Sequence, residues 1–135
     1  MTRINCLPPK VLSDAHLGAE YRELPRVFFQ AHAAFLRGER YDDPRNPDRY
    51  VLGKGHVRFF YPRLGYLARR LEDLVFECQT RGRKTAFHGV PDVFMLMPQS
   101  WRGNWIPSAE DLRLNLKRIV DRGGLRAGYD LKEFI

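Results

Sequence analysis

Apolar residues recur at steps of three and four along three stretches of the chain, which is the period of an amphipathic α-helix. The first stretch begins after Ser13 or Asp14, either of which can cap a helix start, and is expected to end near Gly38. Pro25 lies inside it. Because proline lacks an N–H and its ring clashes with the carbonyl of Tyr21, we expect a kink or break there. The apolar stripe consists of Leu17, Tyr21, Leu24, Phe28, Ala31 and Phe35.

The second and third stretches carry ordinary helix start and stop signals. The second follows Pro62 and ends at Gly82, whereas the third begins at Ser108, forms a capping-box pattern with Asp111 and ends at Gly123. Their apolar faces are Leu64, Leu67, Ala68, Leu71, Leu74, Val75 and Cys78, and Leu112, Leu116, Ile119 and Val120. Three helices and no convincing sheet predict an all-α fold, with a single domain over residues 1–135.

The connections between these stretches are marked by proline and glycine. Residues 40–48, with Pro44 and Pro47, are expected to form an exposed loop, and the aromatic and β-branched residues of 50–61 allow a short extended piece. The segment LGKGH at 52–56 lacks the spacing of a phosphate-binding P-loop. We interpret it as a structural turn, with phosphate contact as the open alternative.

Charge and composition indicate a globular protein that can bind an anionic partner. The 135 residues are 44% hydrophobic, and 23 Lys and Arg against 16 Asp and Glu give a net charge of +7. Nucleic acid is a reasonable partner at such a charge, and the alternatives are an anionic membrane surface, an acidic protein, or a charge that serves only solubility. No apolar run approaches the roughly 20 residues of a membrane span, and no signal sequence is apparent. We expect a soluble monomer, cytoplasmic and nucleoid-associated.

The residue types that bind metals are scattered. Cys6 and Cys78 lack the spacing of a metal or redox motif and are interpreted as two buried thiols. No cofactor and no metal are expected. Trp101 and Trp105 favour core packing over stacking on bases.

Polar residues on the first helix form a second pattern opposite the apolar stripe. At 100° per residue His16, Glu20 and Glu23 share one narrow sector, with Arg22 and Arg26 to one side. A solvated helix face is the simplest interpretation. Arg22 and Arg26 nevertheless repel each other at this spacing, and an anionic ligand would relieve that repulsion.

The third helix carries a second basic cluster. Arg118 and Arg122 are four residues apart and face away from the apolar stripe, with Lys117 nearby. Solvation is again the alternative, but two separate arginine pairs fit a duplex backbone better than a point ligand.

Four segments carry a family resemblance: MTRIN at 1–5, HLGAEYRELPRVF at 16–28, LGKGHVRFFY at 52–61 and PQSWRGNWIP at 98–107. They resemble the pyrimidine-dimer DNA glycosylase and abasic-site (AP) lyase family of the phage ultraviolet-damage endonuclease type, over roughly residues 1–122. The resemblance implies a compact three-helix domain whose N-terminal segment is packed between helices, so that its amine meets the first helix. It also implies a role in DNA base excision repair on double-stranded DNA.

The same resemblance assigns roles to residues. Thr2 and Glu23 match the two catalytic positions, and removal of Met1 would expose the amine of Thr2. That amine is a ready nucleophile, because an α-amino group titrates near 7.7–8.0 and a lysine near 10.4. It would form a Schiff base with the sugar and nick the strand by β-elimination, without a metal. The DNA-binding positions implied by the family, together with neighbouring Lys117, are Arg3, His16, Arg22, Arg26, Lys117, Arg118 and Arg122.

Two departures from the family leave the preferred lesion open. The C-terminal tail has only Tyr129 and Phe134 as aromatic residues, and Ala15 stands where a glutamine usually precedes the helix histidine. A different base lesion, or abasic sites alone, are alternative substrates. Two other classes are a DNA-binding protein without catalysis and a metal-dependent hydrolytic nuclease, for which the acidic loop residues are the only carboxylates to cite: Asp42, Asp43 and Asp48.

Overall fold

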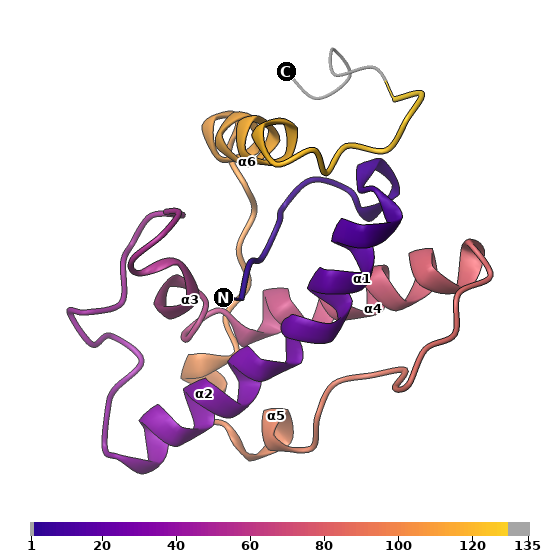
Figure 1. Cartoon of the computed structure of the whole chain (residues 1–135). Helices are drawn as coiled ribbons and strands as arrows, with labels where there is room; N and C mark the ends of the chain where they lie inside the picture. The colour runs from indigo at the N-terminus through magenta and orange to yellow at the C-terminus, as the bar shows by residue number, and fades with distance from the viewer. Residues whose placement is uncertain (1, 130–135) are drawn as a thin grey trace.

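The computed structural model describes residues 2–129, and this part of the chain contains helices, turns and loops but no strand (Figure 1). The all-α prediction is therefore confirmed. Within residues 2–129 no helix is both long and apolar enough to cross a membrane. The long helices are α1 (Asp14–Glu23), α2 (Pro25–Leu36), α4 (Leu64–Thr80) and α6 (Ala109–Asp121), and the short ones are α3 (His56–Phe59) and α5 (Val93–Leu96), with 3-10 turns at Pro9–Val11 and Gln99–Trp101.

The first apolar stripe forms two helices that run end to end, α1 and α2. The break falls at Leu24, as expected from Pro25, which takes the first position of α2, where its missing N–H costs nothing. Ser13 caps α1, because its Oγ accepts from the backbone N–H of His16 at 3.3 Å. All of the stripe is buried except Phe35, which is partly buried.

The predicted caps of α4 and α6 are confirmed as well. Gly82, at a φ of +72°, ends α4 in a turn where the N–H of Arg83 reaches the carbonyl of Cys78 at 2.9 Å. Ser108 and Asp111 form a reciprocal capping box at α6. The inclusion of Val120 in the buried face of α6 was wrong. It is 44% exposed, because Leu116 and Ile119 are the residues that α6 turns toward the core.

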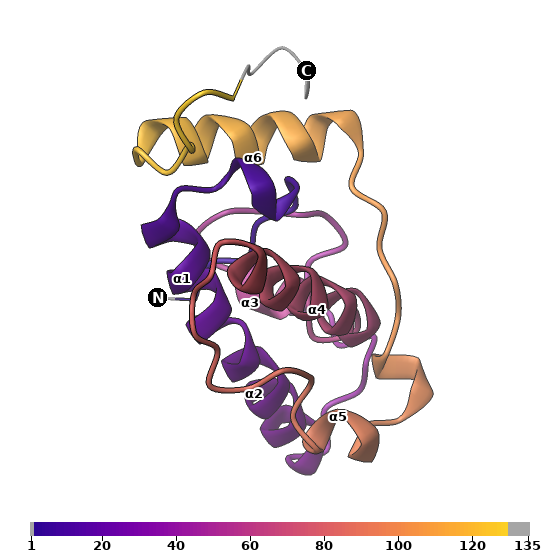
Figure 2. The ribbon, with the colours of Figure 1, turned by 90° about the vertical axis from the view of Figure 1, so that its right-hand side faces the viewer.

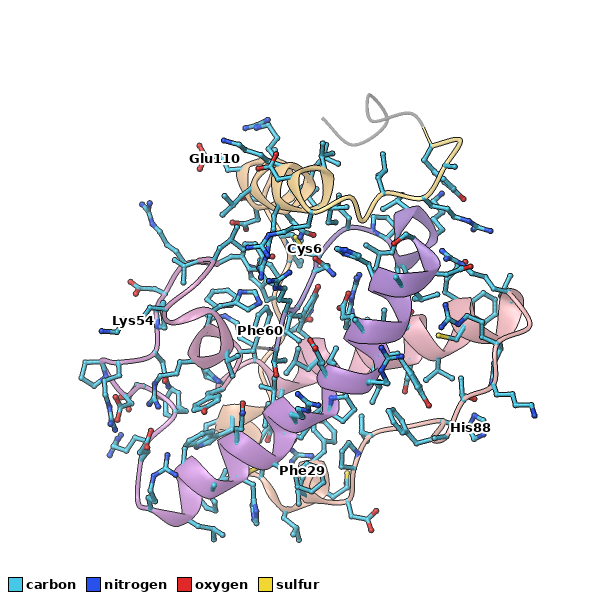
Figure 3. All side chains as sticks on the ribbon, in the orientation of Figure 1. Cys6, Phe29, Lys54, Phe60, His88 and Glu110 are labelled. Atoms are coloured by element: carbon cyan, nitrogen blue, oxygen red, sulfur yellow. The ribbon has the colours of Figure 1, made fainter. Side chains whose placement is uncertain are left out.

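The expectation of an extended piece in residues 50–61 is also wrong. Gly53 and Gly55 adopt positive φ angles that only glycine takes easily, and the chain turns there and enters α3. The aromatic residues that suggested a strand instead form a cluster, with Phe60 facing the interior beside α3 (Figure 3). Trp105 joins this cluster by stacking on Tyr50 at 5.2 Å, and Trp101 is buried, which confirms core packing for both tryptophans.

Other local expectations have mixed outcomes. Cys78 is buried, but Cys6 is only partly buried; burial still raises the pKa of the Cys6 thiol to about 12. Residues 40–48 form an exposed loop of turns, in which Asp42 pairs with Arg40 and Asp43 pairs with Arg45. Within residues 2–129 no three His, Cys, Asp or Glu side chains gather as metal ligands would.

The helices are arranged around the N-terminal segment, residues 2–8. Helix α1 packs on α4 and α2 packs on α5, while α6 lies across one end of this assembly (Figures 1 and 2). The N-terminal segment runs between α1 and α6, with Cys6 directly beneath α6 (Figure 3). Its residues Ile4, Asn5 and Leu7 are buried.

Hydrogen bonds from residues distant in sequence hold the backbone of this segment. The Ile4 N–H donates to His56 Nε2 at 2.8 Å, and the Tyr50 hydroxyl donates to the Ile4 carbonyl at 3.0 Å. Asn115 Oδ1, on α6, accepts from the N–H groups of Cys6 and Leu7 at 2.8 and 3.0 Å. A segment without secondary structure therefore has its buried polar groups satisfied and a defined path.

A buried ion pair also holds the N-terminal segment in place. Glu20 on α1 and Arg70 on α4 are 2% and 4% exposed, and their side chains form two hydrogen bonds of 2.8 and 2.9 Å. Asn5 Nδ2 donates to the same carboxylate at 2.7 Å, and Arg70 Nη1 donates to the Leu7 carbonyl at 2.5 Å. Glu20 thus joins α1, α4 and the N-terminal segment at one point.

Replacing Arg70 should destabilise the protein strongly. In Arg70→Met the Glu20 carboxylate stays buried without its cation, and the free energy of unfolding should fall by about 3–5 kcal/mol in urea titrations. Arg69→Met, at the exposed neighbour on α4, is the matched control and should change it by less than about 0.5 kcal/mol. A loss below about 1 kcal/mol in Arg70→Met would contradict the role given to this pair.

His56 should make stability depend on pH. Burial lowers the pKa of His56 below its ordinary 6.5, partly opposed by the bond to the Val51 carbonyl, 2.8 Å from Nδ1. Below pH 6.5 the unfolded chain therefore binds a proton that the folded chain does not, and stability falls as pH falls, by at most about 1.4 kcal/mol per pH unit from this site.

The measurement is urea unfolding at several pH values between 7.5 and 5.5, for the parent and for His56→Gln. The difference in stability between the two proteins should shrink as the pH falls. Parallel curves for parent and His56→Gln would show that His56 does not titrate as argued.

Candidate active site

A cavity of about 290 Å³ opens where the N-terminal segment, α1 and the C-terminal half of α6 meet. Its size suits a small ligand or one residue of a larger one. The residues that line it are Arg3, Asn5, His16, Ala19, Glu20, Glu23, Arg118, Ile119 and Arg122.

The structure brings together most of the site residues expected from the sequence. His16 and Glu23 reach the cavity from α1, Arg3 from the N-terminal segment, and Arg118 and Arg122 from α6. Thr2 is buried and immediately precedes Arg3 in the chain. The hydrogen bonds at Ile4 and Asn5 therefore hold the chain two and three residues after Thr2.

Lys117 lies beside this cavity and not in its wall. It lines a neighbouring groove of about 390 Å³ together with Arg3, Arg118, Arg122 and the Gly53 turn. The LGKGH segment forms a turn, and its residues Leu52 and Gly53 line this basic groove. Its contact with phosphate stays a prediction.

Arg22 and Arg26 lie outside the cavity wall. Both are exposed, Arg22 on the last turn of α1 and Arg26 on the first turn of α2. The basic residues expected at one site therefore divide into a group around the cavity and a group on the outer surface of α1 and α2.

The cavity is electrostatically suited to an anion. Burial lowers the pKa of Arg118, and the positive charges of Arg3 and Arg122 lower it further. Arg118 Nη1 is buried, and no hydrogen-bond partner for it exists in the described part of the chain. A buried donor without a partner is costly, so an acceptor on a ligand would be favourable here.

The two carboxylates of the cavity are in different states. Glu20 is neutralised by Arg70 and held by Asn5. For Glu23, no Lys or Arg among residues 2–129 lies within ion-pair distance of its carboxylate. Glu23 is therefore the carboxylate of this cavity that has no ion-pair partner among the described residues.

Several residues that build the site were not found from the sequence. Asn115 is a polar residue inside the apolar stripe of α6, and this position was a usable signal of a buried hydrogen bond. Arg70 lies at the margin of the apolar face of α4, where solvation was the simpler interpretation. Nothing local marked Gly124, which packs directly against the His16 ring.

The comparison with known protein families gives one match. The model of the family described as pyrimidine dimer DNA glycosylase matches residues 1–88 of this chain. The matched part includes the N-terminal segment, α1, α2 and α4, and thus the cavity residues Arg3, His16 and Glu23. Helix α6, with Arg118 and Arg122, lies beyond the match.

Gly124 should be required for the position of His16. A methyl group on Gly124 would overlap the His16 ring, so that Gly124→Ala should shift the His16 NMR signals and cost about 1–3 kcal/mol of unfolding free energy. Gly89→Ala is the control, because a Cβ there meets open space, and it should be close to neutral. Unchanged His16 signals in Gly124→Ala would contradict the packing described.

Proposed function

Because this chain belongs to the pyrimidine dimer DNA glycosylase family, we propose that it excises dimerised pyrimidines from double-stranded DNA with the amine of Thr2 and then nicks the strand as an AP lyase. The glycosylase class and the DNA substrate follow from the family. The nucleophile, the lyase step and the residue roles are the proposal. One observation carries it: Glu23, free of ion pairs among residues 2–129, lines a basic cavity beside the anchored N-terminal segment.

The proposed nucleophile depends on the N-terminal segment. Once Met1 is removed, Thr2 is the first residue of the chain. Two residues later, Ile4 is hydrogen-bonded to His56 and Tyr50. These bonds leave little freedom to the terminal amine, and orientation of a nucleophile contributes strongly to rate. An α-amino group also has a substantial neutral fraction near pH 7.5, unlike a lysine.

The reaction begins at the sugar of the damaged nucleotide. The nitrogen of Thr2 attacks C1′, the N-glycosidic bond breaks, and the base leaves with the bonding electrons and takes up a proton. The sugar ring then opens, and the amine and C1′ form an iminium ion. This covalent intermediate divides one difficult substitution into two easier steps.

Strand cleavage follows from the same intermediate. The iminium acidifies the C2′ proton, whose removal expels the 3′ phosphate by cleavage of the C3′–O bond. Hydrolysis of the imine returns the free amine and the unsaturated sugar end. We assign Glu23 to stabilising the cationic sugar and to moving protons at the ring oxygen and C2′, as carboxylates do in glycoside cleavage.

The basic residues serve to bind the duplex. The cavity is lined by Arg3, His16, Arg118 and Arg122, and the adjoining groove by Lys117. Arg22 and Arg26 are exposed on α1 and α2. We assign all seven to phosphate and sugar contacts, which position DNA without reading its sequence. The tail residue Phe134 lies outside the described residues, and Tyr129 packs partly buried against the core.

The test is borohydride trapping on duplexes carrying a cyclobutane dimer, another base lesion or an abasic site. We expect a covalent adduct on the dimer and abasic duplexes, mapped by peptide mass to Thr2 as the first residue, and cleavage that persists with a chelator. Glu23→Gln should slow strand cleavage about 10²-fold or more and retain DNA affinity.

Glu110→Gln is the matched control, since Glu110 is exposed on α6 and points away from the body of the protein (Figure 3). It should cleave at the parent's rate. Absence of an adduct on both duplexes, or mapping of the adduct to another residue, would refute the Schiff-base proposal.

A further inference from the structure

A second basic site lies on α1, where the chain that leaves α4 runs past it (Figure 2). This segment, residues 81–90, includes His88 (Figure 3). It is fixed to α1 through Tyr21, whose ring stacks on that of Phe87 at 4.4 Å. The Tyr21 hydroxyl also accepts from the Phe87 N–H at 2.9 Å and donates to the Phe87 carbonyl at 3.1 Å. Side chains of this segment therefore have defined positions relative to α1.

Arg83 is held in place at both ends. Its backbone belongs to the turn that ends α4, and its Nη1 donates to the Asp14 carbonyl at 2.6 Å. The Asp14 carboxylate lies 3.9 Å from the same nitrogen but is already bound by Arg81 at 2.9 Å. Arg83 Nη2 is directed elsewhere, toward Gly18.

Gly18 creates the space in which two guanidinium groups meet. A Cβ on Gly18 would lie 2.9 Å from Arg83 Nη2 and 3.1 Å from Arg22 Nη1, so these nitrogens are no farther apart than the sum of the two distances. Glycine in the middle of a helix is unfavourable, and its presence at position 18 leaves the space that the two guanidinium groups occupy.

Arg22 has no neutralising partner in the described part of the chain. None of the carboxylates of residues 2–129 lies within ion-pair distance of it. Among the described residues, Asp14 is the one carboxylate within ion-pair distance of Arg83, and it also pairs with Arg81. Two like charges converge here with donors unused, and this arrangement favours an anion with several oxygen acceptors.

We propose that Arg22 and Arg83 together bind one phosphodiester group of the DNA, at a site separate from the cavity. The inference rests on the proposed function for its ligand. Arg22 Nη1 and Arg83 Nη2 each donate to a non-bridging phosphate oxygen above Gly18. Asp14 and the Gly82 turn hold Arg83 ready for this contact, so little side-chain freedom is lost when DNA binds.

The position of this pair determines how the duplex lies. Gly18 and Arg22 are on the side of α1 opposite His16 and Glu20, which face the cavity. Arg118 and Arg122 bind phosphate on the cavity side. Helix α1 therefore lies between two phosphate-binding groups. A duplex that is bound at the cavity and at Arg22 and Arg83 must pass over this helix.

The experiment measures DNA affinity without catalysis. Fluorescence anisotropy with a duplex containing a tetrahydrofuran abasic analogue, which cannot form a Schiff base, is recorded from about 50 to 200 mM KCl. Arg83→Gln should bind roughly 5- to 10-fold more weakly at the lowest salt, and the slope of log K against log[KCl] should fall by about 0.9. Arg83→Lys, which keeps the charge, should restore most of the slope. Arg69→Gln, exposed on α4, should match the parent.

A double-mutant cycle tests whether the two arginines share one phosphate. The affinity loss of Arg22→Gln/Arg83→Gln should be smaller than the product of the single losses. Independent losses, or a parent-like slope in Arg83→Gln, would overturn the proposal. Circular dichroism and urea midpoints establish that each variant is folded.

The outcome is separable from that of the proposed function. Binding to the analogue requires neither Thr2 nor Glu23. A reduced slope in Arg83→Gln without any borohydride adduct in the parent supports the phosphate site and refutes the chemistry. An adduct in the parent with a parent-like slope in Arg83→Gln does the reverse.

Discussion

The buried pair of Glu20 and Arg70 is the interaction on which the rest of the molecule depends. Removing two charges from water is expensive, and it is tolerated only when each hydrogen-bonding group finds a partner. Here the partners include Asn5 and the Leu7 carbonyl, so the N-terminal segment completes the pair. The hydrogen bonds that stabilise the buried ion pair therefore also fix the position of the N-terminal segment.

The positions of Glu20 and Glu23 show how one helix supplies two carboxylates with different partners. They are one turn apart and line the same cavity. Glu20 is neutralised by Arg70 from α4, whereas Glu23 faces the basic wall supplied by Arg118 and Arg122 from α6. Environment, and not residue type, distinguishes the two carboxylates.

The sequence predicted those parts of the fold whose causes are local. The break at Pro25, the capping box of Ser108 and the turn at Gly82 follow from neighbouring residues alone. The aromatic residues around Tyr50 were misassigned because their packing partners, such as Trp105, are distant in the chain. The roles of Arg70 and Asn115 were not predicted for the same reason, because their hydrogen-bond partners, Glu20 and Asn5, are distant in the chain. Family resemblance suggested Glu23 and Arg3, which line the cavity, but it did not divide the arginines between the cavity and the outer surface.

The bond between Asn5 and Asn115 joins residues 110 positions apart. A ribosome must synthesise nearly the whole chain before α6 can receive the N-terminal segment. Until then the leading residues remain accessible, whereas in the finished fold Thr2 is buried. The proposed removal of Met1 would therefore take place during translation, before the fold is complete.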